Sequence, residues 1–96
     1  FGADIEIYFA AESAYFNGHF PMAKILPGAI QLHFAINFAK KLFDKTDYPK
    51  RVKRLKFSNI IRPREIVLLS IKNGENSCTF SYSKQGLPCS SGVLEF

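Results

Sequence analysis

The sequence holds few of the residues that build disulfide frameworks and metal centres. Its 96 residues include no tryptophan and only two cysteines, Cys78 and Cys89. Two cysteines cannot form the network of bridges on which small secreted domains depend, and neither has cysteine or histidine neighbours at the spacing of zinc ligands. We therefore expect two free, buried thiols in a reducing cytoplasm, with no disulfide and no bound metal.

Long apolar runs are absent as well. No run reaches the roughly 18 residues that a membrane-spanning helix needs, and no charged segment followed by an apolar one opens the chain. We therefore expect a soluble protein with no membrane partner. The first residue is Phe1 and not Met, so we also expect further residues to precede it in the full protein.

The chain is rich in phenylalanine and in positive charge. Ten Phe and four Tyr predict a core built from aromatic rings. Thirteen Lys and Arg against eight Asp and Glu give a formal net charge of +5, and most of this excess lies in residues 40–56. Such a segment suits an acidic partner, or it is an ordinary solvated face. Because no basic recognition helix is present, we do not expect nucleic acid as the partner.

The first half of the chain predicts a strand, a loop and one helix. Residues 4–9 alternate apolar and polar side chains, which is the period of a half-buried strand. Residues 12–28 carry an Asn-Gly pair and two prolines, so they form a loop. Residues 29–43 contain neither Pro nor Gly and have apolar side chains on all sides, which predicts a buried helix.

The second half predicts an antiparallel run of strands. The extended segments are residues 52–61, 65–72, 77–83 and 90–96, with tight turns expected after Asn73 and about Gln85 and Gly86. With 47% hydrophobic residues this is one folded domain, residues 1–96, of the α+β class. A helix that is apolar all round needs more cover than one sheet provides, so we expect a dimer.

Both histidines and one glycine are candidates for chemistry. His19 lies between rings in a tight turn, where a neutral imidazole can act as a general base near neutral pH. His33 lies one turn into the helix, and its position alone favours a core histidine satisfied by one hydrogen bond. Gly28 follows Pro27 at the helix start and either offers free backbone N–H groups to a developing oxyanion or is a simple turn residue.

Two of these residues lie in a recognisable pair of motifs. The segment Phe16-Asn17-Gly18-His19-Phe20-Pro21, followed by Ile25-Leu26-Pro27-Gly28 and a helix, resembles the signature of the 3-hydroxyacyl-(acyl-carrier-protein) dehydratases, which have the hot-dog fold. The similarity extends along nearly the whole chain, including residues 52–63 and 91–96. The resemblance implies an antiparallel sheet wrapped around one central helix. It also implies active sites at the interface of a homodimer or of a heteromer with a related hot-dog subunit.

The resemblance also implies roles for three residues. His19 would remove the α-proton of a 3-hydroxyacyl thioester, and the Gly28 N–H would polarise the thioester carbonyl. The family's acidic residue, donated by the partner subunit to protonate the departing hydroxyl, is His33 here. Two imidazoles in one apolar pocket disfavour simultaneous protonation. The substitution is compatible with a dehydratase (a lyase) of altered pH dependence, with an acyl thioesterase, or with a degenerate acyl-binding subunit that needs an active partner.

The substrate implied by the resemblance is carried on the phosphopantetheine arm of an acyl carrier protein, in fatty-acid or polyene biosynthesis. The product is a trans-2-enoyl thioester, and no cofactor of the protein's own is needed. We expect four residues to contact the substrate: Phe16, Phe20, Pro27 and Leu32. Carrier proteins are acidic, and we expect docking on five basic residues: Lys53, Arg54, Lys56, Arg62 and Arg64.

Overall fold

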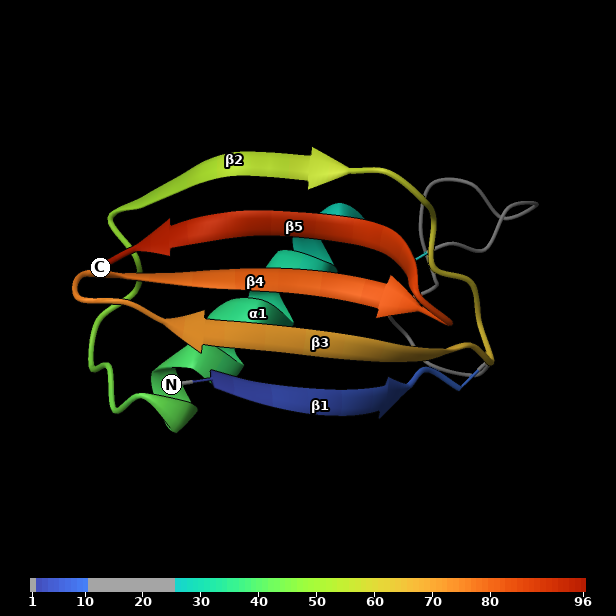
Figure 1. Ribbon diagram of the computed structural model, residues 1–96, viewed down its shortest axis with the longest axis horizontal. Coiled ribbons are helices and arrows are strands. Elements are labelled where there is room, and N and C mark those ends of the chain that lie inside the picture. Colours follow the sequence, from blue (N-terminus) through green and yellow to red (C-terminus); the bar gives the residue numbers. More distant parts are fainter. Residues whose placement is uncertain (1, 11–25) are drawn as a thin grey trace.

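The computed structural model describes residues 2–10 and 26–96. These residues form five strands and one helix (Figure 1). In chain order the elements are β1 (Gly2–Tyr8), α1 (Gly28–Leu42), β2 (Arg51–Phe57), β3 (Ile66–Asn73), β4 (Ser77–Lys84) and β5 (Leu87–Glu95). Every element has the type predicted from its periodicity, although β2 ends earlier and β5 begins earlier than expected.

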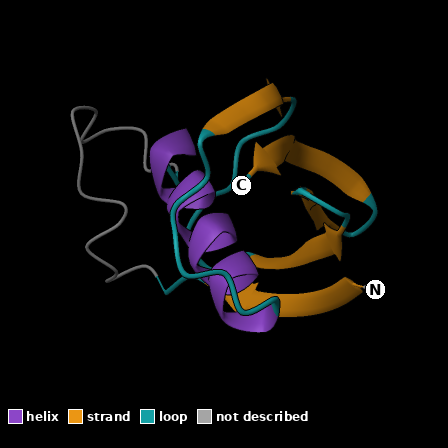
Figure 2. Ribbon diagram, turned by 90° about the vertical axis from the view of Figure 1, so that its left-hand side faces the viewer, coloured by secondary structure: helices purple, strands orange, loops and turns teal. Residues whose placement is uncertain are grey.

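The five strands form one antiparallel sheet in the order β1-β3-β4-β5-β2. The helix lies against one face of this sheet, and the sheet curves around it (Figure 2). This arrangement confirms the predicted α+β layout of one sheet and one helix. We call the face toward α1 the inner face of the sheet.

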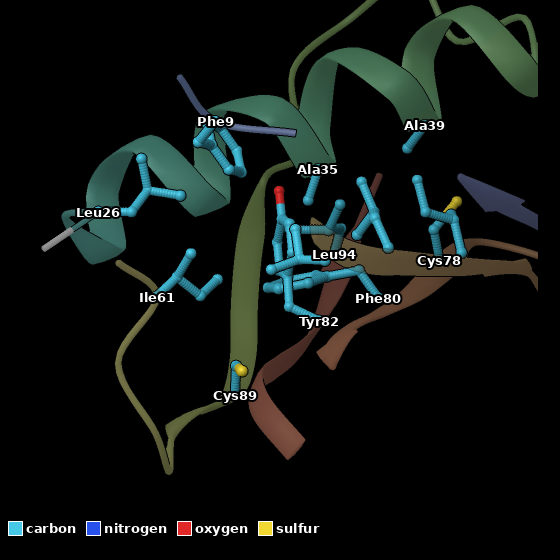
Figure 3. Packing of buried hydrophobic residues seen from close by; sticks show 13 residues of the cluster. Phe9, Leu26, Ala35, Ala39, Ile61, Cys78, Phe80, Tyr82, Cys89 and Leu94 are labelled. Carbon is cyan, nitrogen blue, oxygen red and sulfur yellow. The ribbon is translucent and has the colours of Figure 1, made fainter. Parts of the chain in front are cut away.

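The core lies between the inner face and the helix. Alternate residues of β3 and β4 are fully buried, among them Leu69, Phe80 and Tyr82, and they meet the small residues Ala35 and Ala39 of α1 (Figure 3). The phenylalanine-rich composition therefore contributes to the core as expected, since Phe9 and Phe80 are buried and further Phe side chains pack around them.

The helix is less buried than its composition predicts. Only Gln31, Ala35 and Ala39 are buried, whereas His33 is exposed and Leu42 is 42% exposed. The expectation of a helix buried on all sides is therefore wrong for the single chain. The physical reason is that a single sheet covers one stripe of a helix, so apolar side chains elsewhere on α1 are covered only in part.

The edge strand β2 contains a bulge that decides which of its side chains face inward. Between Lys53 and Lys56 the pairing with β5 shifts, and Arg54 takes a positive φ of 53°. Two residues therefore stand opposite one, and the alternation of side chains is reset at this point. Phe57 consequently lies opposite the buried Ser90, on the inner face.

The hairpin of β4 and β5 keeps the two cysteines apart. Its turn is formed by Gln85 and Gly86, which both have positive φ, as two-residue hairpin turns with the twist of the sheet require. Cys78 stands opposite Leu94, and both Cys78 and Cys89 are buried free thiols, as predicted. Burial raises the pKa of both thiols, so they are held in the neutral form.

Candidate active site

At the N-terminus of α1, two backbone N–H groups have no acceptor among the residues that the structure describes. The helix begins at Gly28 after Pro27, which has an extended backbone and makes no capping hydrogen bond through its side chain. The Pro27 carbonyl accepts hydrogen bonds from the N–H groups of Ile30 (3.1 Å) and Gln31 (3.2 Å). Within residues 2–10 and 26–96, no group accepts from the N–H of Gly28 or Ala29. The positive end of the helix dipole is therefore open to an incoming oxygen.

A pocket of about 330 Å³ lies at the helix start and is lined in part by Gly28. Its lining residues come from the helix start, the end of β2 and the segment after β2: Leu26, Gly28, Gln31, Phe57, Ser58, Asn59 and Ile60. A Cβ atom at Gly28 would lie 2.6 Å from Cζ and 2.8 Å from Cε1 of Phe57. Position 28 therefore requires glycine as long as the Phe57 ring stays in place, and both residues line the pocket.

One wall of the pocket belongs to residues 58–65, which cross the end of the sheet from β2 to β3 (Figure 1). We call these residues the crossing segment. Its backbone is tied to several elements: Ser58 N–H donates to Cys89 O (2.8 Å), Asn59 Nδ2 donates to Pro88 O (2.7 Å), and Ile61 O accepts from Leu26 N–H (2.7 Å). These bonds fix the wall relative to both β5 and the chain that enters α1.

An ion pair holds the same crossing segment to β4. Lys84 Nζ lies 2.9 Å from Glu65 Oε2 and also donates to Ile60 O (2.8 Å). Burial by itself would raise the pKa of the Glu65 carboxyl, but hydrogen bonds from Lys84 and from the Arg62 N–H outweigh it and lower the pKa. Glu65 is therefore ionised at neutral pH and stabilises this wall of the pocket.

Among the residues predicted to act on substrate, Gly28 lines the pocket, whereas Pro27, next to it in the chain, does not. His19, Phe16 and Phe20 lie outside the described residues, so their roles stay predictions. Leu32 is half-buried and packs against the core cluster, but it does not line the pocket.

His33 lies on a different part of the helix surface from the pocket. It is exposed, and Asn37 Nδ2 lies 3.0 Å from its Nε2. His33 does not line the pocket that contains Gly28, so one chain by itself does not bring these two residues together. A core histidine is also excluded, since the ring is exposed.

The five basic residues predicted to dock a carrier protein fall into two groups. Lys53, Arg54 and Lys56 lie on the edge strand β2, whereas Arg62 and Arg64 lie on the crossing segment, where the Arg64 N–H donates to Phe9 O beyond the end of β1. In the strand order β1 and β2 are opposite edges of the sheet. Strand order therefore separates Lys53, Arg54 and Lys56 from the contact between Arg64 and Phe9.

The two groups also differ in their neighbours. Lys53 is engaged with Glu95 at 3.0 Å, and Glu95 also pairs with Arg51. Within the described part of the chain, Arg54 and Lys56 form no ion pair. Arg64 lines a larger hollow, of about 760 Å³, bordered by the start of β3 and the β4–β5 turn. Of the residues predicted to be catalytic that the structure describes, neither Gly28 nor His33 lines this hollow.

Residues 2–10 and 26–96 hold no cluster of three His, Cys, Asp or Glu side chains arranged to bind a metal. In the same residues, no helix has the length and apolar character required to cross a membrane.

Sequence reasoning missed most of the pocket's lining. No sequence motif marks Phe57, Asn59 or Ile60. They line the pocket because β2 ends at Phe57, and the end of a strand cannot be recognised from a motif. Gln31 did carry a signal, since it is the only polar side chain in the first turn of an otherwise apolar helix.

Comparison with known proteins decides the family. A family model described as ApeI-like, ApeI dehydratase, matches residues 2–93. The chain belongs to the ApeI-like dehydratase family. No curated protein sequence matches it.

Two solved structures are similar to this ApeI-like chain. One is the dehydratase heterocomplex ApeI:P from Xenorhabdus doucetiae, with a TM-score of 0.91 and 27% identity, covering 98% of this chain and 85% of that one. The other is an uncharacterised protein from Erwinia carotovora subsp. atroseptica, with a TM-score of 0.80 and 25% identity, covering 98% and 81%. The hot-dog fold is thereby confirmed, and the chain is a dehydratase-like hot-dog protein.

Proposed function

We propose that this ApeI-like protein is a lyase that removes water from 3-hydroxyacyl thioesters and forms trans-2-enoyl thioesters. The observation that carries the proposal is the helix start: the N–H groups of Gly28 and Ala29 have no acceptor within the described residues, and Gly28 lines a pocket. A thioester carbonyl in this pocket would gain negative charge during removal of its α-proton. Fixed N–H donors stabilise such charge without needing to reorganise.

In the proposed reaction His19 removes a proton from the substrate and His33 supplies one to the leaving group. Neutral His19 takes the proton from C2 of the substrate, and the electron pair moves onto the thioester oxygen, which accepts from the Gly28 N–H. The electron pair then returns, the C3–O bond breaks, and, in a homodimer, the imidazolium of the partner subunit's His33 protonates the departing hydroxide to water. One proton has then been gained by His19 and one lost by His33, and exchange with solvent restores both.

Binding of the substrate to an acyl carrier protein is the second part of the proposal. Its phosphopantetheine arm supplies the thioester, so the protein needs no cofactor of its own. The acidic carrier would dock on the β2 edge, where Arg54 and Lys56 are exposed and Phe57 leads directly into the pocket. The protein would act in the cytoplasm, where its buried thiols stay reduced.

Pairing with a second hot-dog subunit is the third part. The apolar side chains of α1 are covered only in part, β2 is an edge strand, and Leu55 and Phe57 on it are 43% and 52% exposed. Exposed apolar surface of this kind marks an interface. The similarity to a chain of the ApeI:P heterocomplex supports a related subunit as the partner, and a homodimer is the alternative.

The experiment measures interconversion of 3-hydroxyacyl and trans-2-enoyl pantetheine thioesters by the purified protein. We expect the reaction with the protein alone or after addition of a related hot-dog subunit, and a loss of about 10² to 10⁴ in rate for His19→Ala. Release of free thiol would identify a thioesterase instead. Binding of the thioester without either reaction, also in the presence of the related subunit, would identify a degenerate subunit.

A further inference from the structure

A network of hydrogen bonds centred on Gln31 lies directly behind the open helix start. Gln31 and Ser90 are the buried polar residues of the described chain, with 3% and 4% of their surface exposed. Gln31 Nε2 donates to Leu26 O (3.1 Å), and its Oε1 accepts from Ser90 Oγ (2.6 Å). The backbone carbonyl of Gln31 accepts from the Tyr82 hydroxyl (2.7 Å), which points toward α1 in Figure 3.

These bonds fix the residue that precedes Pro27 and Gly28. Leu26 is buried, its N–H donates to Ile61 O (2.7 Å), and its carbonyl accepts from Gln31. Both backbone polar groups of Leu26 are therefore held, one by the crossing segment and one by the helix. Because Gln31 is in turn bound to Ser90 of β5, the entry into α1 is tied to the sheet.

This arrangement differs from an ordinary helix cap. A Ser, Thr, Asp or Asn cap stabilises a helix start by accepting from the first free N–H groups, which would occupy them. Here the cap residue is Pro27, which makes no such bond, and the turn is held from its carbonyl side by Gln31. The turn is thus fixed without any bond, from the described part of the chain, to the N–H groups of Gly28 and Ala29.

We infer that Gln31 is a positioning residue, whose buried carboxamide holds the Leu26-Pro27 turn and thereby aims the Gly28 N–H at the pocket. The inference rests on the proposed function for its effect on turnover, but its effect on the Gly28 amide is independent of any activity. A carboxamide is required because one end must donate to Leu26 O while the other accepts from Ser90. An ionised Glu has no donor, and Met has neither group.

The test compares Gln31→Glu, Gln31→Met and Ser90→Ala with the control Ser91→Ala, which changes the neighbouring residue of β5 on the other side of the strand. The first readout is the backbone amide spectrum of protein labelled with ¹⁵N-glycine. We expect the Gly28 signal to shift, and its hydrogen exchange to accelerate, in the first three variants and to stay unchanged in Ser91→Ala. The Gly74 signal, from the β3–β4 turn at the other end of the sheet, serves as an internal reference (Figure 1).

The second readout is dehydration of a pantetheine thioester under conditions in which every variant is folded. Misplacement of a catalytic donor by about 1 Å costs about 10²-fold, so we expect such a loss in kcat for Gln31→Met with a small change in KM. A protonated Glu can donate and accept as Gln does. The kcat of Gln31→Glu relative to wild type should therefore recover as the pH is lowered, and that of Gln31→Met should not.

The outcomes separate the two proposals. A Gly28 signal that moves in a protein without dehydratase activity supports the positioning role and contradicts the proposed function. An unchanged Gly28 signal in Gln31→Glu and Ser90→Ala overturns the positioning role, whatever the activity. If Gln31→Met does not fold, the positioning role is judged from Gln31→Glu and Ser90→Ala. Each of these variants removes only one of the two side-chain hydrogen bonds of Gln31. A wild-type kcat in all folded variants would also overturn the inference.

Discussion

Gly28 is the residue whose replacement tests the pocket most directly. In Gly28→Ala the new Cβ meets the Phe57 ring at less than 3 Å. Because this ring is 52% exposed it can swing outward, so we expect the fold to persist and the pocket to change shape. Turnover of a pantetheine thioester should fall by about 10²-fold, as for a misplaced catalytic group. The double variant Gly28→Ala/Phe57→Ala, in which the clash is removed, should recover part of this loss, and no recovery would locate the defect elsewhere.

His33 is the residue at which this chain departs from the dehydratases it resembles. The ring is exposed in the single chain, so the carboxylate in His33→Glu stays hydrated and the melting temperature should change little. We expect His33→Ala to lose about 10² to 10⁴ in rate and His33→Glu to retain activity with a shifted pH profile. Full activity of His33→Ala would remove His33 from the mechanism.

At the scale of elements, the crossing segment between β2 and β3 depends on Lys84. In Lys84→Met the hydrogen bonds to Glu65 and Ile60 are lost, and hydrogen bonds to charged groups contribute about 1.5 to 3 kcal/mol. Partial exposure of the pair reduces this value, so we expect a loss of about 1 to 2 kcal/mol at pH 7. Chemical denaturation measures it, with Lys72→Met, at an exposed position of β3, as the control.

The same ion pair predicts a pH dependence. The pKa of Glu65 is lowered in the folded protein, so its contribution is complete above the ordinary glutamate pKa of about 4.3 and is lost as the pH falls through the lower folded-state pKa. The stability difference between wild type and Lys84→Met should therefore be constant from pH 7 to about 5 and shrink below about pH 4. A difference that is constant down to pH 2 would contradict the assignment.

Most of the element plan could be predicted from local sequence. The alternation in β1, β3 and β4 and the continuous apolar helix are properties of neighbouring residues, and they predicted each element's type. The extent of β2 could not be predicted, because the bulge at Arg54 and the end at Phe57 are set by pairing with β5, more than thirty residues later in the chain. Helix burial was overestimated because it depends on how much of α1 the sheet covers.

At the scale of the whole molecule, we expect a dimer or a heterodimer. For a homodimer, sedimentation at micromolar concentration should give twice the mass of the monomer. For a heterodimer, a dimer mass should appear only after the related subunit is added. Leu55→Asp, which places a charge on the exposed part of β2, should weaken this association. A folded monomer under both conditions would remove the basis for a shared active site.

Carrier docking is also a property of the whole surface. Charge reversal in Arg54→Glu or Lys56→Glu should raise KM for the carrier-bound substrate by about fivefold, which corresponds to roughly 1 kcal/mol for exposed charges. The effect should be larger at low salt, and pantetheine thioesters should be unaffected. Lys72→Glu is the control, since Lys72 lies on a strand away from the β2 edge. Equal losses on both substrates would indicate a folding defect instead.

The sequence by itself determined the types of the elements, the free thiols and the position of the helix start at Pro27-Gly28, because each of these follows from residues close together in the chain. Only the tertiary structure decided the pocket. It brings Phe57 against Gly28, and Ser90 and Tyr82 against Gln31, from segments up to 59 residues apart. It also leaves His33 outside the lining of the pocket, and it places Lys53, Arg54 and Lys56 on β2 but Arg62 and Arg64 on the segment between β2 and β3. The reason is that these relations depend on strand order and on packing between distant segments, which no local pattern encodes.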